Sequence, residues 1–494
     1  MAGLSSPGIG SGLDVNSIVP QLVAIERRPI TLLTAQTTSL QAKLSAFGLL
    51  QSYTVNIHDA VAKLAKPTFW EQTSASSSDA SAATVSASSA AGIGSYSMEV
   101  SQLAQAQSLA SAGYADSSAS VGTGTLHIAI GKWTRIETPG ALPGDPPTVS
   151  NTFVPATPPS EIDVPVPLGE DSLESVRAKI NAAGAGVSAS IVKDASGSRL
   201  VIRSTTTGEE HSVRITATAD PAGASGKSLA DLVYDPENLN PSPMQQTIAA
   251  QNAKASFDGL ALESTSNTFA DVSAGVSVTV AKVTSAPVTL KVGLDTAAMK
   301  SSVTDFVAAY NALNKYVADQ TKYDADKKVG ATLQGDASTL SVQGQLRSAV
   351  RASNMGASPQ LARLSDVGIE VQADGSLKVN DAKLSAAMGN MAEFTKAFTH
   401  VDPVNPGSSG FAVRLQALAK SLTNTDGVVS TRSQGLRASI ARNDKQVGVY
   451  EDRVAAFQER MLKQYSALDV TINKLSALNA YVTQQVTTWN KQRY

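Results

Sequence analysis

The chain has 494 residues, a length that corresponds to about three domains, and its formal net charge is only −2. This charge gives no support for nucleic acid or an anionic membrane as the main partner. The sequence holds no cysteine, which excludes a disulfide framework and thiol chemistry. It has no run of about 18 apolar residues, so we expect no membrane span. The first residues lack the features of a secretory signal peptide, which is typical of a cytoplasmic protein or of export that reads an uncleaved N-terminus.

The N-terminal region predicts two helices separated by a proline. Ser17 is placed to cap the first helix, which carries Leu22 on its apolar face, and Pro29 predicts a break after Arg28. The second helix has a stripe at heptad-like spacing. This stripe contains Leu33, Leu40, Leu44, Phe47, Thr54, Ile57, Val61 and Leu64.

A serine- and alanine-rich segment follows at residues 74–91, where only Asp79, Thr84 and Val85 are of other types. Such a composition is compatible with a flexible linker. Residues 82–87 and 96–100, however, alternate in the manner of strands. We therefore favour an extended, partly paired crossover into a β-rich region.

The middle of the chain predicts β structure with one helix. Residues 124–130 are a predicted strand, and residues 139–167, with nine of the prolines, are predicted to form an exposed loop with extended stretches because proline is excluded from central strands. A helix over residues 172–183 and a hairpin over 187–203, with a further strand near 211–217, indicate a compact α+β unit. More strands are expected over 253–292.

Helical periodicity returns at Met299 and continues through helices near residues 338–351, 384–398 and 411–422, interrupted by a hairpin whose turn is Asp374-Gly375. The stretch 436–489, near the C-terminal end of the sequence, carries an apolar seam at alternating spacings of three and four, which is typical of a coiled coil. It predicts one nearly continuous helix about 80 Å long, which packs antiparallel against the N-terminal helices. The polar seam residues Asn443 and Asn479 weaken the seam or fix its register.

No pattern points to catalysis. The four histidines, His58, His127, His211 and His400, stand apart from other metal-ligating residues at metal-site spacing. Gly226-Lys227-Ser228 resembles the end of a phosphate-binding loop, but the position that requires its first glycine is Pro221. Asp324 opens a calcium-like loop in which Lys328 replaces an oxygen ligand, so a solvated turn is favoured. We expect no enzyme activity, no cofactor and no bound metal.

Several motifs, in the correct order along nearly the whole chain, resemble the flagellar hook-associated protein 2 family, which forms the cap of the flagellar filament. They are GIGSGLDVNSIV from residue 8, GSYSMEVSQLAQAQ from residue 94, FVAAYNAL from residue 306, LQGD from residue 333 and QYSALD from residue 464. The region 122–216, with INAAGAGVSASIV from residue 180, resembles the flagellin hook motif. The proline-rich segment 138–167 is longer than the family pattern.

The resemblance implies a multidomain α+β protein with long antiparallel terminal coiled-coil helices and a helical leg domain that carries inserted β-rich head domains. The expected division is residues 1–45 with 445–494 for the terminal coiled coil, 46–93 with 294–444 for the leg, 94–121 with 247–293 for one head domain, and 122–246 for a second. The candidate contacts with the filament or other subunits are Leu22, Leu33, Leu40, Leu468, Ile472, Leu475, Val482 and Val486.

The family also implies partners and a location. The protein would assemble with itself as a ring, a pentamer in the leading interpretation, and would contact flagellin, hook-filament junction proteins and an export chaperone at its C-terminus. It would be secreted unfolded through the flagellar type III apparatus, without a cleaved signal peptide, and would promote flagellin folding and insertion at the filament tip. The alternatives are another flagellar axial protein, or a tip adhesin whose head binds host glycans or mucin.

Overall fold

The computed structural model describes residues 14–138, 148–220, 228–239 and 241–491. The chain divides into two compact units, which are described separately below. A helical unit contains residues Met1–Trp70 and Thr296–Tyr494, and a β-rich unit contains Glu71–Asp295. The β-rich unit is therefore an insertion between two halves of the helical unit, as the order of the predicted elements indicates.

The helical unit is built on α2 (Arg28–Leu64, 37 residues) and α9 (Val428–Lys491, 64 residues). Its other helices are α1 (Val15–Glu26), α4 (Thr296–Thr321), α5 (Ala337–Arg351), α6 (Asp381–Ala387), α7 (Met391–Thr399) and α8 (Phe411–Thr423), with short 3-10 turns η1 (Pro67–Phe69) and η4 (Pro406–Ser408). Two small hairpins, β16–β17 (Tyr323–Asp324, Val329–Gly330) and β18–β19 (Ile369–Val371, Leu377–Val379), join the helices. The long C-terminal helix and the Asp374-Gly375 hairpin are confirmed.

The N-terminal helices differ from the prediction in one detail. Asp14, and not Ser17, caps α1, because its carboxylate accepts the backbone N–H of Ser17 at 3.1 Å. Pro29 lies in the first turn of α2, where a missing N–H costs no hydrogen bond. The predicted break falls at Arg27, between α1 and α2.

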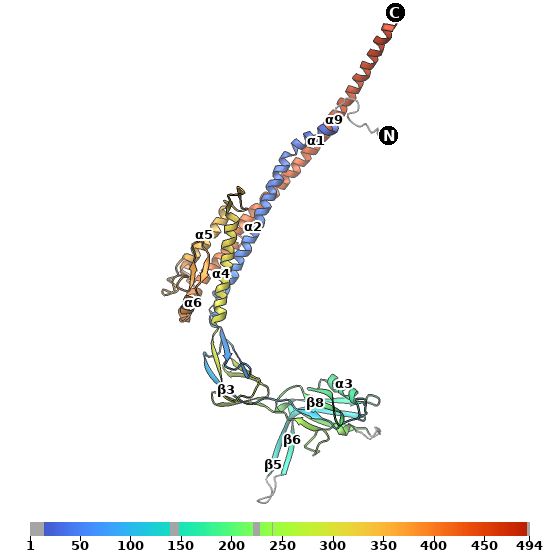
Figure 1. The fold of residues 1–494 in the computed structure, drawn as a ribbon, viewed down its shortest axis with the longest axis vertical. Coiled ribbons are helices and arrows are strands. Elements are labelled where there is room, and N and C mark those ends of the chain that lie inside the picture. Colours follow the sequence, from blue (N-terminus) through green and yellow to red (C-terminus); the bar gives the residue numbers. More distant parts are fainter. Residues whose placement is uncertain (1–13, 139–147, 221–227, 240, 492–494) are drawn as a thin grey trace. The chain divides into compact units, whose positions relative to one another are not determined.

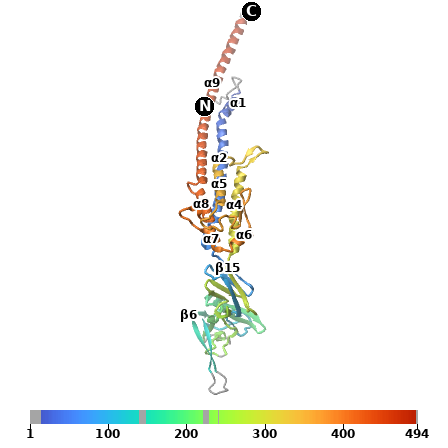
Figure 2. The same cartoon turned by 90° about the vertical axis from the view of Figure 1, so that its left-hand side faces the viewer.

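The core of the helical unit gathers aromatic side chains where α2 meets the helices of the second half of the chain. α2 packs against α4, α8 and α9, as Figure 2 shows. Trp70 is buried, its indole N–H donates to the Leu64 carbonyl at 2.9 Å, and its ring lies 5.2 Å from that of Phe394 and 5.1 Å from that of Phe398. These contacts close the helical unit at the point where the chain leaves it.

One half of the β-rich unit combines a five-stranded and a three-stranded sheet. The larger has the order β1-β15-β3-β11-β12 and the smaller β13-β14-β2. Their bounds are β1 (Thr73–Ser77), β2 (Ala83–Ala87), β3 (Gly94–Gln102), β11 (Ala253–Phe257), β12 (Leu260–Ser264), β13 (Thr268–Ser273), β14 (Val276–Val280) and β15 (Val288–Leu294). The serine- and alanine-rich segment is therefore paired, as predicted, because β1 pairs with β15 and β2 with β14.

The other half places α3 (Leu173–Ala183) beside a four-stranded sheet of order β10-β4-β8-β7 and a three-stranded sheet of order β6-β5-β9. Their bounds are β4 (Ser108–Ala110), β5 (Gly124–Thr138), β6 (Thr148–Val166), β7 (Val187–Asp194), β8 (Gly197–Ser204), β9 (Ser212–Ala219) and β10 (Gln245–Ile248), with 3-10 turns η2 (Glu209–His211) and η3 (Leu229–Leu232). Each half has its own apolar cluster.

The interpretation of residues 139–167 as a loop is wrong for its described part. Residues 148–166 form β6, which pairs with β5 from Gly124↔Val166 to Thr138↔Thr148. β6 lies at the edge of its sheet and has a neighbouring strand on one side only. The N–H groups that Pro155, Pro158, Pro159 and Pro165 lack are therefore not needed for hydrogen bonds to a second strand. The rule that excludes proline from central strands holds, but it permits an edge strand as well as a loop.

The predicted four-part division remains a prediction, although one boundary needs adjustment. Residues 73–87 were expected in the leg domain, whereas β1 and β2 belong to sheets of the β-rich unit. The N-terminal segment of the helical unit therefore ends at Trp70.

Candidate assembly surface

α1 and α9 form an apolar seam that covers only part of α9. Val15, Val19 and Val23 of α1 are buried together with Val454 of α9, and Phe457, Met461 and Tyr465 pack at the edge of this cluster with Ile30. Arg453 Nη2 lies 3.8 Å from Glu26 Oε2 on the side of the seam. Figure 1 shows α1 and α2 running beside α9 in the opposite direction, which confirms the antiparallel packing of the terminal helices.

Beyond Tyr465, α9 continues to Lys491, a length of about 39 Å at 1.5 Å per residue. Every side chain from 473 to 491 is exposed. Leu475 is 59% exposed and Trp489 is 69% exposed. The apolar seam therefore continues along α9 with its side chains in solvent. We call the residues Leu468, Ile472, Leu475, Val482 and Val486 the free stripe.

The free stripe is the continuation of the buried seam. At 100° per residue, Leu468 and Ile472 fall within about 40° of Met461, and Val482 and Val486 return to the same side of the helix. The stretch from residue 475 to 490 contains no Asp, Glu, Lys or Arg. A partner helix would therefore be held by apolar packing and not selected by ion pairs across the seam.

The eight predicted contact residues do not share one environment. Leu22, Leu33 and Leu40 are half-buried on α1 and α2, and Ile472 is half-buried on α9. Leu468, Leu475, Val482 and Val486 are exposed. The structure thus brings the α9 residues onto one stripe and leaves the N-terminal three on a separate part of the coiled coil.

The prediction missed several exposed apolar side chains. Leu478 and Tyr481, each 58% exposed, lie on α9 beside the free stripe, and Ile25 and Leu32 are exposed on α1 and α2. Tyr481, Val482, Val486 and Trp489 line a shallow groove on α9. The predicted seam runs from Leu475 through Asn479 to Val482, so it passes over Leu478, although Leu478 also fits a spacing of three and then four. Tyr481 lies next to a seam position and not on the seam. The scarcity of charge around both residues is the available signal.

Polar residues interrupt the covered part of the seam. Asn443 on α9 and Thr37 on α2 are both buried. Neither Asn443 Nδ2 nor Thr37 Oγ1 has a hydrogen-bond partner among the described residues. An unsatisfied polar group in a helical interface weakens the interface and can fix its register. Asn479, the other polar seam residue, is exposed.

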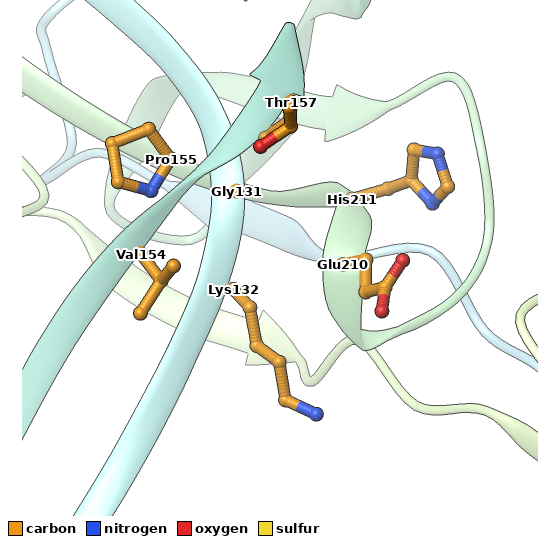
Figure 3. Close-up of a pocket in the computed structure, with 8 residues that line it drawn as sticks. Gly131, Lys132, Val154, Pro155, Thr157, Glu210 and His211 are labelled. Carbon is orange, nitrogen blue, oxygen red and sulfur yellow. The ribbon is translucent and has the colours of Figure 1, made fainter. Parts of the chain in front are cut away.

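The β-rich unit contains a separate open pocket of about 470 Å³ where β6 bends across β5. Figure 3 shows Lys132, Glu210 and His211 around it, with Val154 and Pro155 on β6. The bend follows from a register shift, from Ile130↔Ser160 to Gly131↔Pro155. Gly131 allows β6 to approach, because a Cβ there would lie 2.2 Å from the Val154 carbonyl oxygen.

Two of the other candidate residues, His127 and Asp324, take part in hydrogen bonds with neighbouring residues. His127 Nδ1 lies 2.6 Å from Asp163 Oδ1, and its Nε2 lies 3.0 Å from Thr218 Oγ1. Asp324 Oδ1 accepts the backbone N–H groups of Asp326 and Lys327, as in a solvated turn. Gly226 and Lys227 lie outside the described residues, and Ser228 caps η3.

The described residues contain no group of three or more His, Cys, Asp or Glu side chains placed to hold a metal ion. They also contain no helix with the length and apolar character needed to cross a bilayer.

Fold and surface together define a coiled-coil structural protein with an inserted β-rich unit and an uncovered terminal helix. Family models described as flagellar hook-associated protein 2 C-terminus and N-terminus match residues 250–477 and 11–107, and the flagellin hook IN motif matches residues 150–206. The B-type flagellar hook-associated protein 2 of Pseudomonas aeruginosa is 31% identical over 98% of both chains. The flagellar hook-associated protein 2 of Escherichia coli K12 is 29% identical over 98% of both.

A solved structure agrees with these matches. The D1-D2-D3 domains of the flagellar cap protein from Escherichia coli superpose with a TM-score of 0.56 at 26% identity, over 79% of this chain and 99% of that one. The chain belongs to the flagellar hook-associated protein 2 family. This family is a structural one, and the α+β fold expected from the resemblance is confirmed.

Proposed function

We propose that this protein caps the distal end of the bacterial flagellar filament and promotes the folding and insertion of flagellin beneath it. The observation that carries the proposal is the free stripe of α9, in a chain whose relatives are flagellar hook-associated and cap proteins. A cap needs a surface that holds the filament end and still releases it when a subunit is added. A long helix whose apolar seam outlasts its intramolecular partner provides such a surface.

The strength of the contact can be bounded. Each fully buried leucine or isoleucine contributes about 1.5–3 kcal/mol relative to an exposed one. Several stripes acting together, one from each subunit, would hold the cap through multivalency even if each contact is weak. The exposed Asn479 within the stripe limits how tightly any one helix is held. Anchoring and stepping are then compatible.

The finer partners belong to the same proposal. The protein would act as a ring of identical subunits, with a pentamer as the leading stoichiometry, and would bind flagellin and hook-filament junction proteins. An export chaperone would cover the free stripe before secretion through the flagellar type III apparatus, because an exposed apolar helix invites aggregation in the cytoplasm. Binding of host glycans or mucin by the β-rich unit stays an alternative role.

The decisive experiment places charge on the free stripe. Leu468→Asp with Ile472→Asp should leave export and the fold of the β-rich unit intact, yet give short or absent filaments and flagellin released into the medium. The matched control is Ser466→Asp with Asn473→Asp, which adds the same charge on the opposite side of α9. Normal filaments from the stripe variant would move the capping contact away from α9.

A further inference from the structure

The hairpin of β5 and β6 extends beyond the sheet to which it belongs. β9 pairs with β5 only from Gly124 to Gly131, whereas β6 accompanies β5 as far as Thr138. Among the described residues, β5 beyond Gly131 is therefore paired on one side only. Figure 1 shows the two strands leaving the body of the β-rich unit side by side. We call residues 132–138 and 148–154 the arm.

The base of the arm is held firmly. Trp133 packs 4.8 Å from the ring of Phe153 and 5.9 Å from that of Tyr234, and its indole N–H donates to the Val213 carbonyl at 3.0 Å. The guanidinium of Arg214 lies 4.6 Å from the centre of the Phe153 ring. The free part of the arm is thus presented from a fixed base.

One hydrogen bond shows which backbone groups of the arm face outward. The backbone N–H of Phe153 donates to Glu237 Oε2 at 3.3 Å, so it points away from β5. In an antiparallel pair, two residues directly opposite each other either exchange backbone hydrogen bonds or both direct their backbone N–H and C=O groups toward the outer edges. Trp133, which faces Phe153, therefore also directs its backbone groups away from β6.

The alternation of the strands extends this assignment along the arm. Arg135 and Glu137 lie two and four residues after Trp133, so they also direct their backbone N–H and C=O groups outward, on the β5 edge. Their partners on β6, Asn151 and Val149, direct theirs outward on the β6 edge. The arm therefore has two edges on opposite sides. The β5 edge is open at Arg135 and Glu137, and the β6 edge is open at Val149. Nearer the base, Asn151 Nδ2 donates to the Pro236 carbonyl at 3.4 Å, so residues 236 and 237 cover the β6 edge there.

The β6 strand of the arm lacks the usual devices that protect an open edge, because its prolines begin only at Pro155 and residues 148–154 contain no charged side chain. The β5 strand of the arm does carry charges, on Lys132, Arg135 and Glu137. One face of the arm carries the exposed residues Thr134, Ile136 and Val154. A two-stranded ribbon in water is marginally stable, and a further strand stabilises it.

We propose that the arm pairs edge to edge with the arm of a second copy, so that the β5 edge at Arg135 and Glu137 receives the β6 edge at Val149. The occupant follows from the chain itself, because β6 already forms an antiparallel ladder with this part of β5. The uncharged strand 148–154 places no like charge beside Arg135 or Glu137.

Such pairing is head to tail, since each copy offers one edge of each kind. Head-to-tail contacts close into rings when the rotation between copies allows it. The inference rests on the proposed function, because a cap assembles from identical subunits. The arm would supply one contact between neighbouring subunits.

Proline substitutions in the full-length protein test the pairing. Arg135→Pro and Val149→Pro each remove one outward N–H without removing a bond between β5 and β6. We expect each variant to lose self-association at least ten-fold in sedimentation velocity. Arg135→Ala, which keeps the N–H, is the matched control and should associate like the unsubstituted protein.

A mixture of the two variants distinguishes head-to-tail from symmetric pairing. Arg135→Pro keeps its β6 edge and Val149→Pro keeps its β5 edge, so an equimolar mixture should form a one-to-one dimer. Loss of association in only one variant would indicate like-with-like pairing and would overturn the proposal. Normal association of both variants would also overturn it, as would an unsubstituted protein that stays monomeric. Filament growth is scored separately, so that failure of capping with intact arm pairing counts only against the proposed function.

Discussion

Asp336 Oδ2 accepts two hydrogen bonds from the guanidinium of Arg432, from Nε at 3.1 Å and from Nη2 at 2.8 Å. The other carboxylate oxygen of Asp336 accepts the backbone N–H of Thr339 at 3.1 Å and so caps α5. A single buried carboxylate thus ties the start of α5 to the first turns of α9. It is the last residue of the LQGD motif, for which the sequence alone suggests no role.

We expect this contact to make the stability of the helical unit sensitive to acid. Burial by itself would raise the pKa of Asp336, but the hydrogen bonds from Thr339 and Arg432 outweigh it and hold the pKa below the ordinary value. A carboxyl with a lowered pKa contributes stability above the ordinary value, about 3.9, and loses it as the pH falls through the folded-state pKa. Asp336→Asn should cost about 2 kcal/mol at pH 7 and flatten the loss of stability below about pH 4. Denaturant unfolding at several pH values measures both, and an unchanged acid slope would contradict the assignment.

Replacing the buried polar seam residue should stabilise the helical unit. Asn443→Leu removes an amide nitrogen without a partner among the described residues and adds apolar contact, with an expected gain of about 1 kcal/mol in thermal unfolding. Asn479→Leu, at an exposed seam position, is the control and should leave the melting temperature of the subunit unchanged. A loss of stability in Asn443→Leu would mean that the amide is satisfied in solution.

The uncovered end of α9 should be the first part of the subunit cut by protease. A helix of about 26 residues without a packing partner frays in water. Limited trypsin digestion followed by mass spectrometry should show cleavage after Lys474 before cleavage after Arg453, which lies beside α1. Equal rates at the two sites would indicate that something covers the free stripe in the isolated subunit.

The β-rich unit should fold by itself. The buried members of its two apolar clusters all lie within residues 82–292, Ala75 of β1 packs against one of them, and β1 and β2 pair only with strands of the same unit. A fragment of residues 71–295 should melt cooperatively in circular dichroism. A shorter fragment, 94–292, lacks β1 and β2 and should melt at a lower temperature. Equal melting temperatures would place residues 73–87 outside the cooperative unit.

Gly131 should tolerate no side chain. In Gly131→Ala the new Cβ would meet the backbone of Val154 and Pro155, so β6 must shift, at an expected cost of about 1–3 kcal/mol to the unfolding free energy of the β-rich unit. Gly293→Ala is the control, because no atom outside its chain neighbours lies within 4 Å of the added Cβ. Chemical denaturation of the 71–295 fragment compares the two, and equal stability would mean that the strands separate without cost.

Local periodicity was enough to predict most elements. The spacing of Met299, Phe306 and Leu313 indicates a helix because one face of that helix must be apolar, and all three are buried on α4. The alternation around Val276, Val278 and Val280 predicts β14 for the corresponding reason with a period of two. These patterns depend only on neighbours along the chain. The sequence could likewise place Leu468 and Val486 on one apolar stripe.

What the sequence by itself determined is therefore the kind of each element, the insertion of the β-rich part between helices, and the apolar face of α9. Only the tertiary structure decided that Pro155 and Pro158 lie on an edge strand, that Asp336 holds Arg432, and that the packed part of the α9 seam ends at Tyr465. The physical reason is that these features depend on pairs of residues far apart in the chain. A pattern shows which face of an element avoids water, whereas the partner that covers the face, and where that partner ends, is set by packing between distant segments.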